Sequence, residues 1–566
     1  MGAREDIQTE LVSAGQVFEL ETVSVHGNPL RVFKNAPRTL GEVWLTAAKR
    51  GDIPYLIFDD VVMTFSEADK QVRSLAAWLQ AQGIQQGDRV AVGMRNYPEW
   101  VIAYWATQCI GAVLVSLNAW WVTDELKYAL SDSGARAVVV DGERQDRLSN
   151  EVLEELGIDI AVVTRGEVRQ GWAMWHEVTA NEKPDIRDVN METDDIATIL
   201  YTSGTTGFPK GAAGTHRNYI TNMWNGLLGL AVGARVAGIT PSSTPKPQTV
   251  ALSTFPFFHI AGLCGMNANT NNGVCIITQY KWDAADALRL VEKYKVNTLG
   301  GVPTVVRSFL EHPDFGKYDL SSIAAISQGG APVPPDSVAT IEKEFAGKVG
   351  AANGYGLTET TAAVIGNSGA AYFAKKDSVG LPFVGTDIRV VNEEGTDLPV
   401  GSIGEVWIYG PNNVQGYWNK AEETAKAFTN GWFHSGDAGF VDKDGFVYIV
   451  DRIKDMVLRG GENVYCVEVE TVLFEHDAVK DCAVIGLPHE KLGEEVAAVI
   501  VPADGRGAQD VAALLEFLRS RLAGFKVPSK VFWQLDELPR NATGKVLKKD
   551  LRDRYHLIET DSEHLR

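Results

Sequence analysis

The chain has 566 residues, more than one compact core holds at about 100–200 residues per domain, so we expect at least two domains. Apolar residues make up 45% and charged residues 22%, values that exclude a disordered or fibrous chain. The net charge of −20 repels phosphate backbones and argues against a general nucleic-acid binder.

The cysteines and the N-terminal segment indicate the compartment. Five cysteines, an odd number with no CxxC pair, argue against a disulfide framework or a structural zinc site. The opening segment, MGAREDIQTE, is charged and lacks the apolar core of a secretion signal. We therefore expect a cytoplasmic protein.

One segment, Trp100–Thr123, is long enough to span a bilayer and contains no charged residue. It contains several polar residues and a glycine break at Gly111, and the surrounding chain alternates between strand and helix. We therefore predict a buried helix over 98–110 and a short buried strand within 111–118. The protein is not expected to be an integral membrane protein.

Much of the first 450 residues alternates between apolar strands and amphipathic helices, the pattern of an α/β protein with mostly parallel sheets. Between two strands, residues 282–295 predict a helix with Asp283 as its N-cap and an apolar stripe of Leu288, Val291 and Tyr294. The strands are predicted at 89–94, 135–140, 159–164, 196–202, 249–255, 296–302 and 323–329.

The sequence pattern changes near residue 385. Short apolar segments and the turn pairs Glu394-Gly395 and Asp444-Gly445 predict a small β-rich module there. After Asp451 comes a mixed α+β stretch long enough for its own core, with helices expected near 467–476, 509–523 and 546–555. We predict a large N-terminal domain, residues 1–451, and a small mobile C-terminal domain, residues 452–566.

The sharpest local motif is YTSGTTGFPKG, residues 201–211, which follows an apolar strand. Its glycines allow close backbone approach, and its hydroxyls and amide groups can form a nest for phosphate oxygens. It is not a Walker loop. A flexible surface loop has a similar composition, so the motif alone favours a phosphate site only modestly.

A second motif, NGYGLTET at 353–360, offers the flat ring of Tyr355 for a purine, the hydroxyl of Thr358 and the carboxylate of Glu359 for Mg²⁺. A glycine turn before a helix is the alternative.

Further along the chain, WFHSGD at 432–437 ends in Asp437, which could accept both hydroxyls of a ribose. The remaining motifs lie at 451–455, 459–463 and 539–545, and each taken alone could be an ordinary charged loop or a solvated helix.

In their order and spacing, these motifs resemble the adenylate-forming superfamily of acyl-CoA synthetases, coumarate–CoA ligases, beetle luciferases and peptide-synthetase adenylation domains. The resemblance covers about residues 40–555, and the sequences of the motifs are most similar to those of fatty-acid–CoA ligases. The motifs that carry it are YTSGTTGFPKG, GYGLTET, SGD, DRIKDM and NATGK.

The resemblance implies roles for individual residues. It places catalytic functions on Lys545, Glu359, Thr358 and Thr205, with Glu359 as the Mg²⁺ ligand. The nucleotide would be bound by Thr202, Ser203, Gly204, Thr205, Thr206, Gly207, Lys210, Gly329, Gly330, Ala331, Tyr355, Gly356, Asp437 and Arg452. The acyl site would include His259 and Gly354, the CoA-facing loop Arg459, Gly460 and Gly461, and the hinge Lys454.

The implied activity is an ATP-dependent carboxylic acid–CoA ligase that uses Mg²⁺ and coenzyme A and forms an acyl adenylate first. The candidate pocket stretches 259–269 and 354–365 are largely small and apolar, and they contain no Lys or Arg to hold a second carboxylate. We therefore expect a medium- or long-chain fatty acid. An aryl or arylpropenoic acid is the alternative, and a luciferase-type adenylating oxidoreductase is the alternative class. The expected partners are small molecules, with a homodimer possible.

Overall fold

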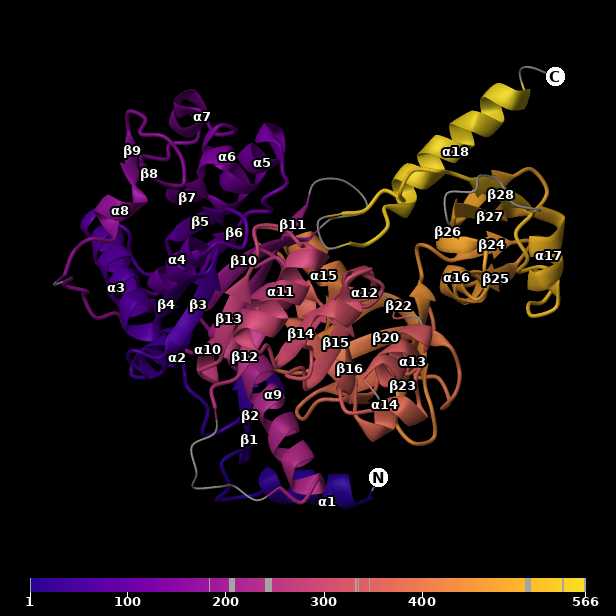
Figure 1. The fold of residues 1–566 in the computed structure, drawn as a ribbon, viewed down its shortest axis with the longest axis horizontal. Helices are drawn as coiled ribbons and strands as arrows, with labels where there is room; N and C mark the ends of the chain where they lie inside the picture. The colour runs from indigo at the N-terminus through magenta and orange to yellow at the C-terminus, as the bar shows by residue number, and fades with distance from the viewer. Residues whose placement is uncertain are drawn as a thin grey trace.

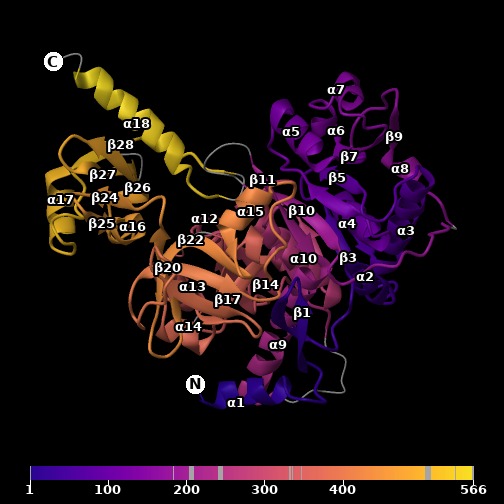
Figure 2. The ribbon, with the colours of Figure 1, turned by 180° about the vertical axis from the view of Figure 1, so that it is seen from behind.

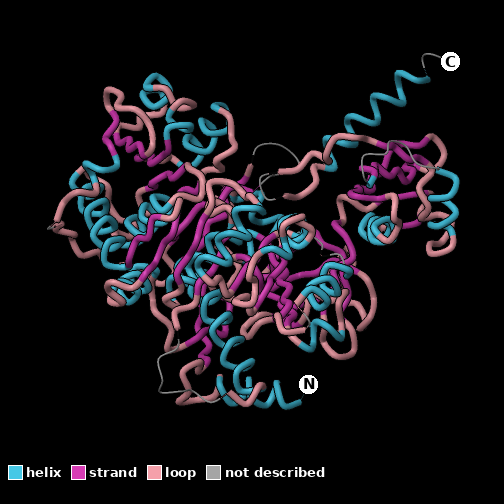
Figure 3. Tube along the Cα trace, in the orientation of Figure 1, coloured by secondary structure: helices cyan, strands magenta, loops and turns pink. Residues whose placement is uncertain are grey.

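The structure is a computed structural model that describes residues 2–182, 184–202, 209–239, 247–330, 333, 335–345, 347–503, 511–541 and 544–563. Two large, mostly parallel sheets with helices on their faces form the main body, and a small β-rich sheet and a C-terminal unit follow them (Figures 1 and 3). The α/β fold class with an α+β C-terminal region is therefore confirmed.

The first large sheet has seven strands, and all neighbours are parallel except β10 and β11. Its spatial order is β11 (Lys210–Thr215), β10 (Ile196–Thr202), β6 (Val113–Ser116), β5 (Arg89–Gly93), β7 (Ala137–Asp141), β8 (Ile160–Thr164) and β9 (Trp172–Met174).

The second large sheet has nine strands, with a parallel centre and antiparallel edges. Its spatial order is β18 (Leu381–Pro382), β17 (Ala362–Ser368), β16 (Gly350–Leu357), β15 (Ala325–Gly329), β14 (Thr298–Gly301), β12 (Val250–Ser253), β13 (Cys275–Thr278), β3 (Pro54–Phe58) and β4 (Val61–Thr64).

Helices cover both sheets. The described ones before the C-terminal unit are α1 (Gly2–Leu11), α2 (Leu40–Ala48), α3 (Phe65–Ala81), α4 (Pro98–Cys109), α5 (Thr123–Ser133), α6 (Gly142–Gln145), α7 (Asn150–Glu155), α8 (Trp175–Val178), α9 (His216–Val236), α10 (Ile260–Asn271), α11 (Ala284–Tyr294), α12 (Pro303–Leu310), η1 (Phe315–Lys317), α13 (Pro335–Glu344), η2 (Thr358–Thr360), α14 (Ala370–Ala374) and α15 (Ala421–Ala427).

The predicted α/β elements are confirmed where local pattern is strong. The strand expected at 196–202 is β10, and the helix expected after Asp283 is α11, whose first turn donates the Asp286 N–H to the Asp283 side chain. The uncharged segment near residue 100 is α4 followed by β6, as predicted, with Trp100 and Trp105 fully buried. None of the described helices is both long and apolar enough to cross a membrane.

The predicted β-rich module is an antiparallel sheet. Its strands are β19 (Asp387–Val391), β20 (Gly404–Tyr409), β22 (Trp432–Val441) and β21 (Phe428–Thr429), with β23 (Val447–Arg452) paired to β22. The turn pair Asp444-Gly445 joins β22 to β23, and Glu394-Gly395 lies between β19 and β20.

A short antiparallel pair, β1 (Leu20–Val25) and β2 (Asn28–Phe33), lies near the N-terminus. Figure 2 shows α1 beside the far end of α9, where Glu10 and Arg235 form an ion pair of 2.8 Å.

The C-terminal unit lies beside the main body, and its last helix projects away (Figure 1). It has two apolar clusters of its own, on the two faces of its sheet. Its elements are β24 (Val457–Arg459), β25 (Glu462–Val464), α16 (Cys466–Phe474), β26 (Val479–His489), β27 (Gly493–Pro502), α17 (Val511–Arg519), β28 (Lys530–Trp533) and α18 (Lys548–Glu563). The predicted hinge, Lys454, is exposed between β23 and β24, and the domain boundary there stays a prediction.

Candidate active site

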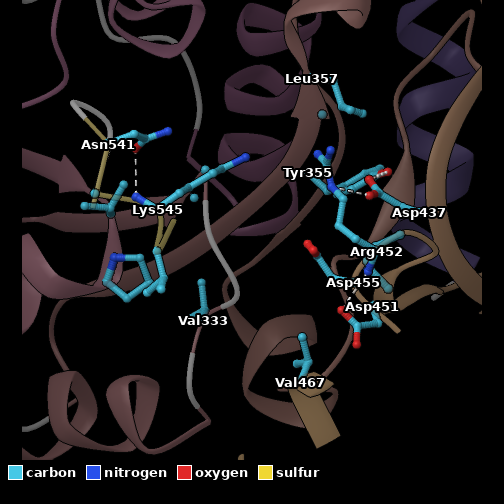
Figure 4. Close-up of a pocket in the computed structure, with 18 of the residues that line it drawn as sticks. Val333, Tyr355, Leu357, Asp437, Asp451, Arg452, Asp455, Val467, Asn541 and Lys545 are labelled. Carbon is cyan, nitrogen blue, oxygen red and sulfur yellow. Dashed lines mark hydrogen bonds and ion pairs between the residues drawn. The ribbon is translucent and has the colours of Figure 1, made fainter. Parts of the chain in front are cut away.

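A cleft opens where the carboxyl ends of several parallel strands face the C-terminal unit. Thr202 at the end of β10, Val302 after β14 and Gly329 at the end of β15 all line it. Open α/β sheets bind ligands at this edge, because the strands stop there and the loops leave room. Figure 4 shows the part of the cleft in which the predicted site residues gather.

Asp437 is the centre of a buried polar group in this cleft. The antiparallel register of β22 and β23 pairs Asp437 with Arg452, and the Arg452 Nε lies 2.7 Å from Asp437 Oδ1. The Tyr355 hydroxyl donates to Asp437 Oδ2 at 2.5 Å (Figure 4). Because Asp437 is only 3% exposed, these partners compensate its charge in place of water. Burial, followed by the Asp437 charge, raises the pKa of Tyr355 well above its usual value.

Glu359 lies in η2 and is also buried, with its carboxylate turned toward Tyr417. The Tyr417 hydroxyl donates to Glu359 Oε1 at 2.8 Å, and burial, followed by Glu359, raises the pKa of Tyr417. No described residue is hydrogen-bonded to the second oxygen, Oε2. This oxygen is therefore the one free to hold a cation.

The phosphate-loop motif is described only at its two ends. The Thr202 hydroxyl donates to the Lys210 carbonyl at 3.3 Å. The Lys210 ammonium forms an ion pair of 2.5 Å with Glu423 and lies 5.0 Å from the centre of the Tyr417 ring. The predicted contributions of Ser203, Gly204, Thr205, Thr206 and Gly207, and that of Ala331, lie outside the described residues.

Lys545 extends into the cleft from the C-terminal unit, across from Tyr355, Asp437 and Arg452 (Figure 4). Its N–H donates to the Asn541 side chain at 2.9 Å, and Arg540 donates to the Gly544 carbonyl at 2.7 Å. Burial, followed by the positive charge of Arg452, lowers the pKa of Lys545 to about 8. The side chain therefore changes its protonation state slightly above neutral pH.

The C-terminal unit contacts the main body on the side of α12. A side chain built on Gly544 would come within 3.0 Å of Val302, so the loop before Lys545 packs closely on the end of β14. The Arg307 side chain donates to the Lys480 carbonyl at 3.3 Å, and its guanidinium lies 5.6 Å from the Phe474 ring centre. These contacts hold the lysine in the cleft.

The predicted acyl residues, His259 and Gly354, lie on two different elements of the main body. His259 is the N-cap of α10, where its Nδ1 accepts from the Ala261 N–H at 3.3 Å. Burial, followed by the charge of Lys545, lowers the pKa of His259 to about 4, which keeps the imidazole neutral. Gly354 lies in β16, where a built side chain would be 3.2 Å from the Ala363 side chain. Both residues line the cleft.

The remaining predicted residues fall into two groups. Thr358, Gly356, Gly329 and Gly330 line the cleft with Tyr355. The predicted CoA-facing loop does not: Arg459 donates to the Phe525 carbonyl at 2.5 Å, and the Gly460 N–H donates to the Leu492 carbonyl at 2.7 Å. Arg459, Gly460 and Gly461 are not among the described residues that line the cleft.

Sequence reasoning missed Tyr417, Arg540 and Arg307. Tyr417 lies 58 residues from Glu359, and no period or motif links the two. Arg540 directly precedes the NATGK motif, but its ion pair with Asp481, at 2.6 Å, joins residues 59 apart in the chain and has no local signal. Arg307 acts across two units, and only their packing shows its contacts.

The residues present fit one magnesium ion held together with a substrate. Among the described residues, no group of three or more His, Cys, Asp or Glu side chains is close enough to bind a metal unaided. Mg²⁺ typically takes one or two carboxylates plus substrate phosphates. Glu359, with its free Oε2, would supply the one carboxylate.

Comparison with known proteins supports this arrangement. Residues 43–418 match the family described as AMP-binding enzyme, and residues 468–545 match the AMP-binding enzyme C-terminal domain. A feruloyl-CoA synthase from an Amycolatopsis species is 37% identical over 87% of this chain and 94% of its own length. A long-chain-fatty-acid–CoA ligase from Bacillus subtilis strain 168 is 32% identical over 92% of this chain and 94% of its own length.

Solved structures give the same result. ATP-bound MatB from Rhodopseudomonas palustris is 30% identical and superimposes with a TM-score of 0.80, covering 92% of this chain and 99% of that one. The o-succinylbenzoate CoA synthetase of Bacillus subtilis, solved with ATP and a magnesium ion, is 28% identical with a TM-score of 0.75, over 90% of this chain and 98% of that one. The chain therefore belongs to the AMP-binding enzyme family, within the adenylate-forming superfamily of acyl-CoA synthetases and ligases.

Proposed function

We propose that this protein is an ATP-dependent carboxylic acid–CoA ligase that forms AMP and pyrophosphate. The observation that carries the proposal is the meeting of three groups in one cleft: the ammonium of Lys545, the carboxylate of Glu359, and the pair of Asp437 with Arg452. Each group matches one need of acid activation by ATP.

The first half-reaction converts the carboxylate into a better acyl donor. A carboxylate oxygen attacks the α-phosphorus of ATP and pyrophosphate leaves, so negative charge accumulates on the phosphoryl oxygens. Lys545 neutralises this charge, and the hydroxyl of Thr358 and the loop at 202–210 hold the phosphates. Asp437 and Arg452 bind the ribose, and Tyr355 offers its ring to the adenine. Mg²⁺ on Glu359 would neutralise further phosphate charge.

The second half-reaction transfers the acyl group to the thiol of coenzyme A. A thiol with a pKa of about 8.5 is partly ionised near neutral pH, so no strong protein base is needed. The incoming thiol cannot share the cleft with Lys545. We infer that the C-terminal unit rotates about Lys454, removing Lys545 and presenting Arg459, Gly460 and Gly461.

The class of acid is the finer part of the proposal. The relatives point two ways, toward an arylpropenoic acid and toward a long-chain fatty acid. A medium- or long-chain fatty acid suits the small apolar residues of the acyl pocket, and an aryl acid is the alternative. A cytoplasmic location and a homodimer stay predictions.

The experiment is to measure AMP formation from ATP with a panel of carboxylic acids, with and without coenzyme A. We expect AMP release that needs the acid, ATP, Mg²⁺ and coenzyme A together, and an acyl-CoA product by mass spectrometry. Adenylate formation that is not drawn off by coenzyme A would contradict a CoA ligase and favour an oxidative, luciferase-type fate.

A further inference from the structure

Residues of two helices, α9 and α10, line the acyl end of the cleft, and we refer to this part as the acyl branch. The described residues that line this branch are nearly all small: Gly226 from α9, and Ala261, Cys264, Gly265 and Ala268 from α10. Side chains built on Gly226 and Gly265 would meet nothing within 4 Å, so both glycines face open space. The branch could therefore hold the body of an acid, and one polar residue, Asn222 of α9, interrupts its apolar lining.

The orientation of the Asn222 amide is fixed by its partners. Its nitrogen, Nδ2, donates to the Thr361 carbonyl at 3.0 Å and to the Ala363 carbonyl at 3.2 Å. Carbonyl oxygens can only accept, so a flipped amide would place oxygen against oxygen. Both amide hydrogens are thus committed to the backbone, and the oxygen, Oδ1, must point elsewhere.

A second asparagine one turn earlier gives a direct contrast. Asn218 also donates its amide hydrogens to two carbonyls, those of Pro411 and Asn413, at 2.8 and 2.9 Å. Its oxygen, however, accepts the Thr215 N–H at 2.8 Å, and its side chain lies outside the cleft. Asn222 Oδ1 accepts no hydrogen bond from any described residue, and Asn222 is only half-buried in the wall of the cleft.

The position of Asn222 assigns it to the acid and not to the nucleotide. Ala363, to which Asn222 is anchored, is the residue that faces Gly354 of the predicted acyl site. Gly226, one turn further along α9, faces the same branch. An acid bound against these lining residues of α9 and α10 would contact Asn222.

We propose that Asn222 is a specificity-determining residue whose Oδ1 accepts a hydrogen bond from a hydroxyl group on the acid, so that the preferred substrates are hydroxylated carboxylic acids. The proposal rests on the acid–CoA ligase function above and refines its substrate class. An acid without a hydroxyl would cover this oxygen and leave it without a partner in apolar surroundings, which is penalised. Sites built to hydrogen-bond a substrate hydroxyl reject the analogue that lacks it.

The test uses pairs of acids that differ only in a hydroxyl group. One pair is phenylpropenoic acid and its 4-hydroxy derivative, and the other is dodecanoic acid and 12-hydroxydodecanoic acid. We expect kcat/KM for CoA-dependent AMP formation to favour the hydroxylated member of at least one pair by about tenfold, as one hydrogen bond supplies. The pair that responds tells whether the hydroxyl is phenolic or aliphatic.

Asn222→Ala should bring that ratio to about one. Asn218→Ala is the matched control: it removes the same kind of two-carbonyl anchor outside the cleft and should leave the ratio unchanged. Both acids of a pair are assayed on the same preparation, so partial unfolding of a variant cancels in the ratio. Asn222→Ser serves if the alanine variant does not fold.

The proposal is overturned if the wild-type enzyme favours the unhydroxylated acid, or neither acid, in both pairs. It is equally overturned if Asn222→Ala keeps the wild-type ratio. Either result leaves the ligase function standing, because AMP release with any acid of the panel establishes that function by itself.

Discussion

The pKa of Lys545 makes a quantitative prediction about the adenylation step. With a pKa of about 8, about 90% of these side chains carry a proton at pH 7 and about 10% at pH 9. Only the protonated form can neutralise the charge that develops on the α-phosphate. We therefore expect kcat/KM for ATP, measured as acid-dependent pyrophosphate release, to fall about tenfold between pH 7 and pH 9.

Two variants identify the titrating group. Lys545→Arg keeps its charge through pH 9, so it should be slower but independent of pH over this range. Lys545→Ala should lose about 10²–10³ in rate at pH 7, as when other donors to a developing charge are removed. Transfer from supplied acyl adenylate to coenzyme A should instead speed up with pH, because the thiol ionises. A tenfold fall that persists in Lys545→Arg would refute the assignment to this lysine.

Three further predictions concern the nucleotide, the metal and the hinge. Asp437→Ala should raise the dissociation constant of ATP about tenfold to a hundredfold, because a charge-assisted hydrogen bond to the ribose is lost. Calorimetry on the folded variant measures this constant, and an unchanged value would show that Asp437 does not bind the ribose. Tyr417→Phe keeps the ring but removes the hydrogen bond to Glu359 Oε1, and it should weaken Mn²⁺ binding in the presence of ATP about tenfold, as measured by electron paramagnetic resonance. The control is Tyr448→Phe, which removes the hydroxyl of another tyrosine that donates to a carboxylate and should leave Mn²⁺ binding unchanged. Lys454→Pro restricts φ at the hinge and should slow one half-reaction far more than the other. We expect pyrophosphate exchange to survive and transfer to coenzyme A to be lost. Near-wild-type rates in both half-reactions would show that residue 454 is not the pivot.

Local pattern predicted the elements of this fold because it depends on neighbouring residues only. The apolar run 196–202 became β10 at the expected bounds, and Asp283 caps α11 as its sequence position requires. The order of the motifs along the chain was also readable, because a motif is recognised from residue types and spacing alone. Such features need no knowledge of packing.

The contacts inside the cleft could not be read in the same way. Asp437 meets Arg452 through the register of two strands, and Glu359 meets Tyr417 across a long chain separation. The position of Lys545 depends on how the C-terminal unit packs against α12 through Arg307. These are tertiary relations, and the sequence contains no local signal for them.

The ion pair of Lys210 with Glu423 has a consequence for the order of events at the site. Lys210 is the loop lysine expected to meet the ATP phosphates, and here an internal carboxylate occupies it. Glu423 therefore acts as an intramolecular competitor of the nucleotide, present at every active site whatever the solution contains. The pair is partly exposed, and ion pairs open to solvent contribute little, so the several charges of a triphosphate would outcompete a single carboxylate for Lys210. Displacement of Glu423 would break the contact between Lys210 and α15, a helix whose Glu423, Lys426 and Ala427 line the same cleft, so the binding of ATP would be coupled to the position of that helix.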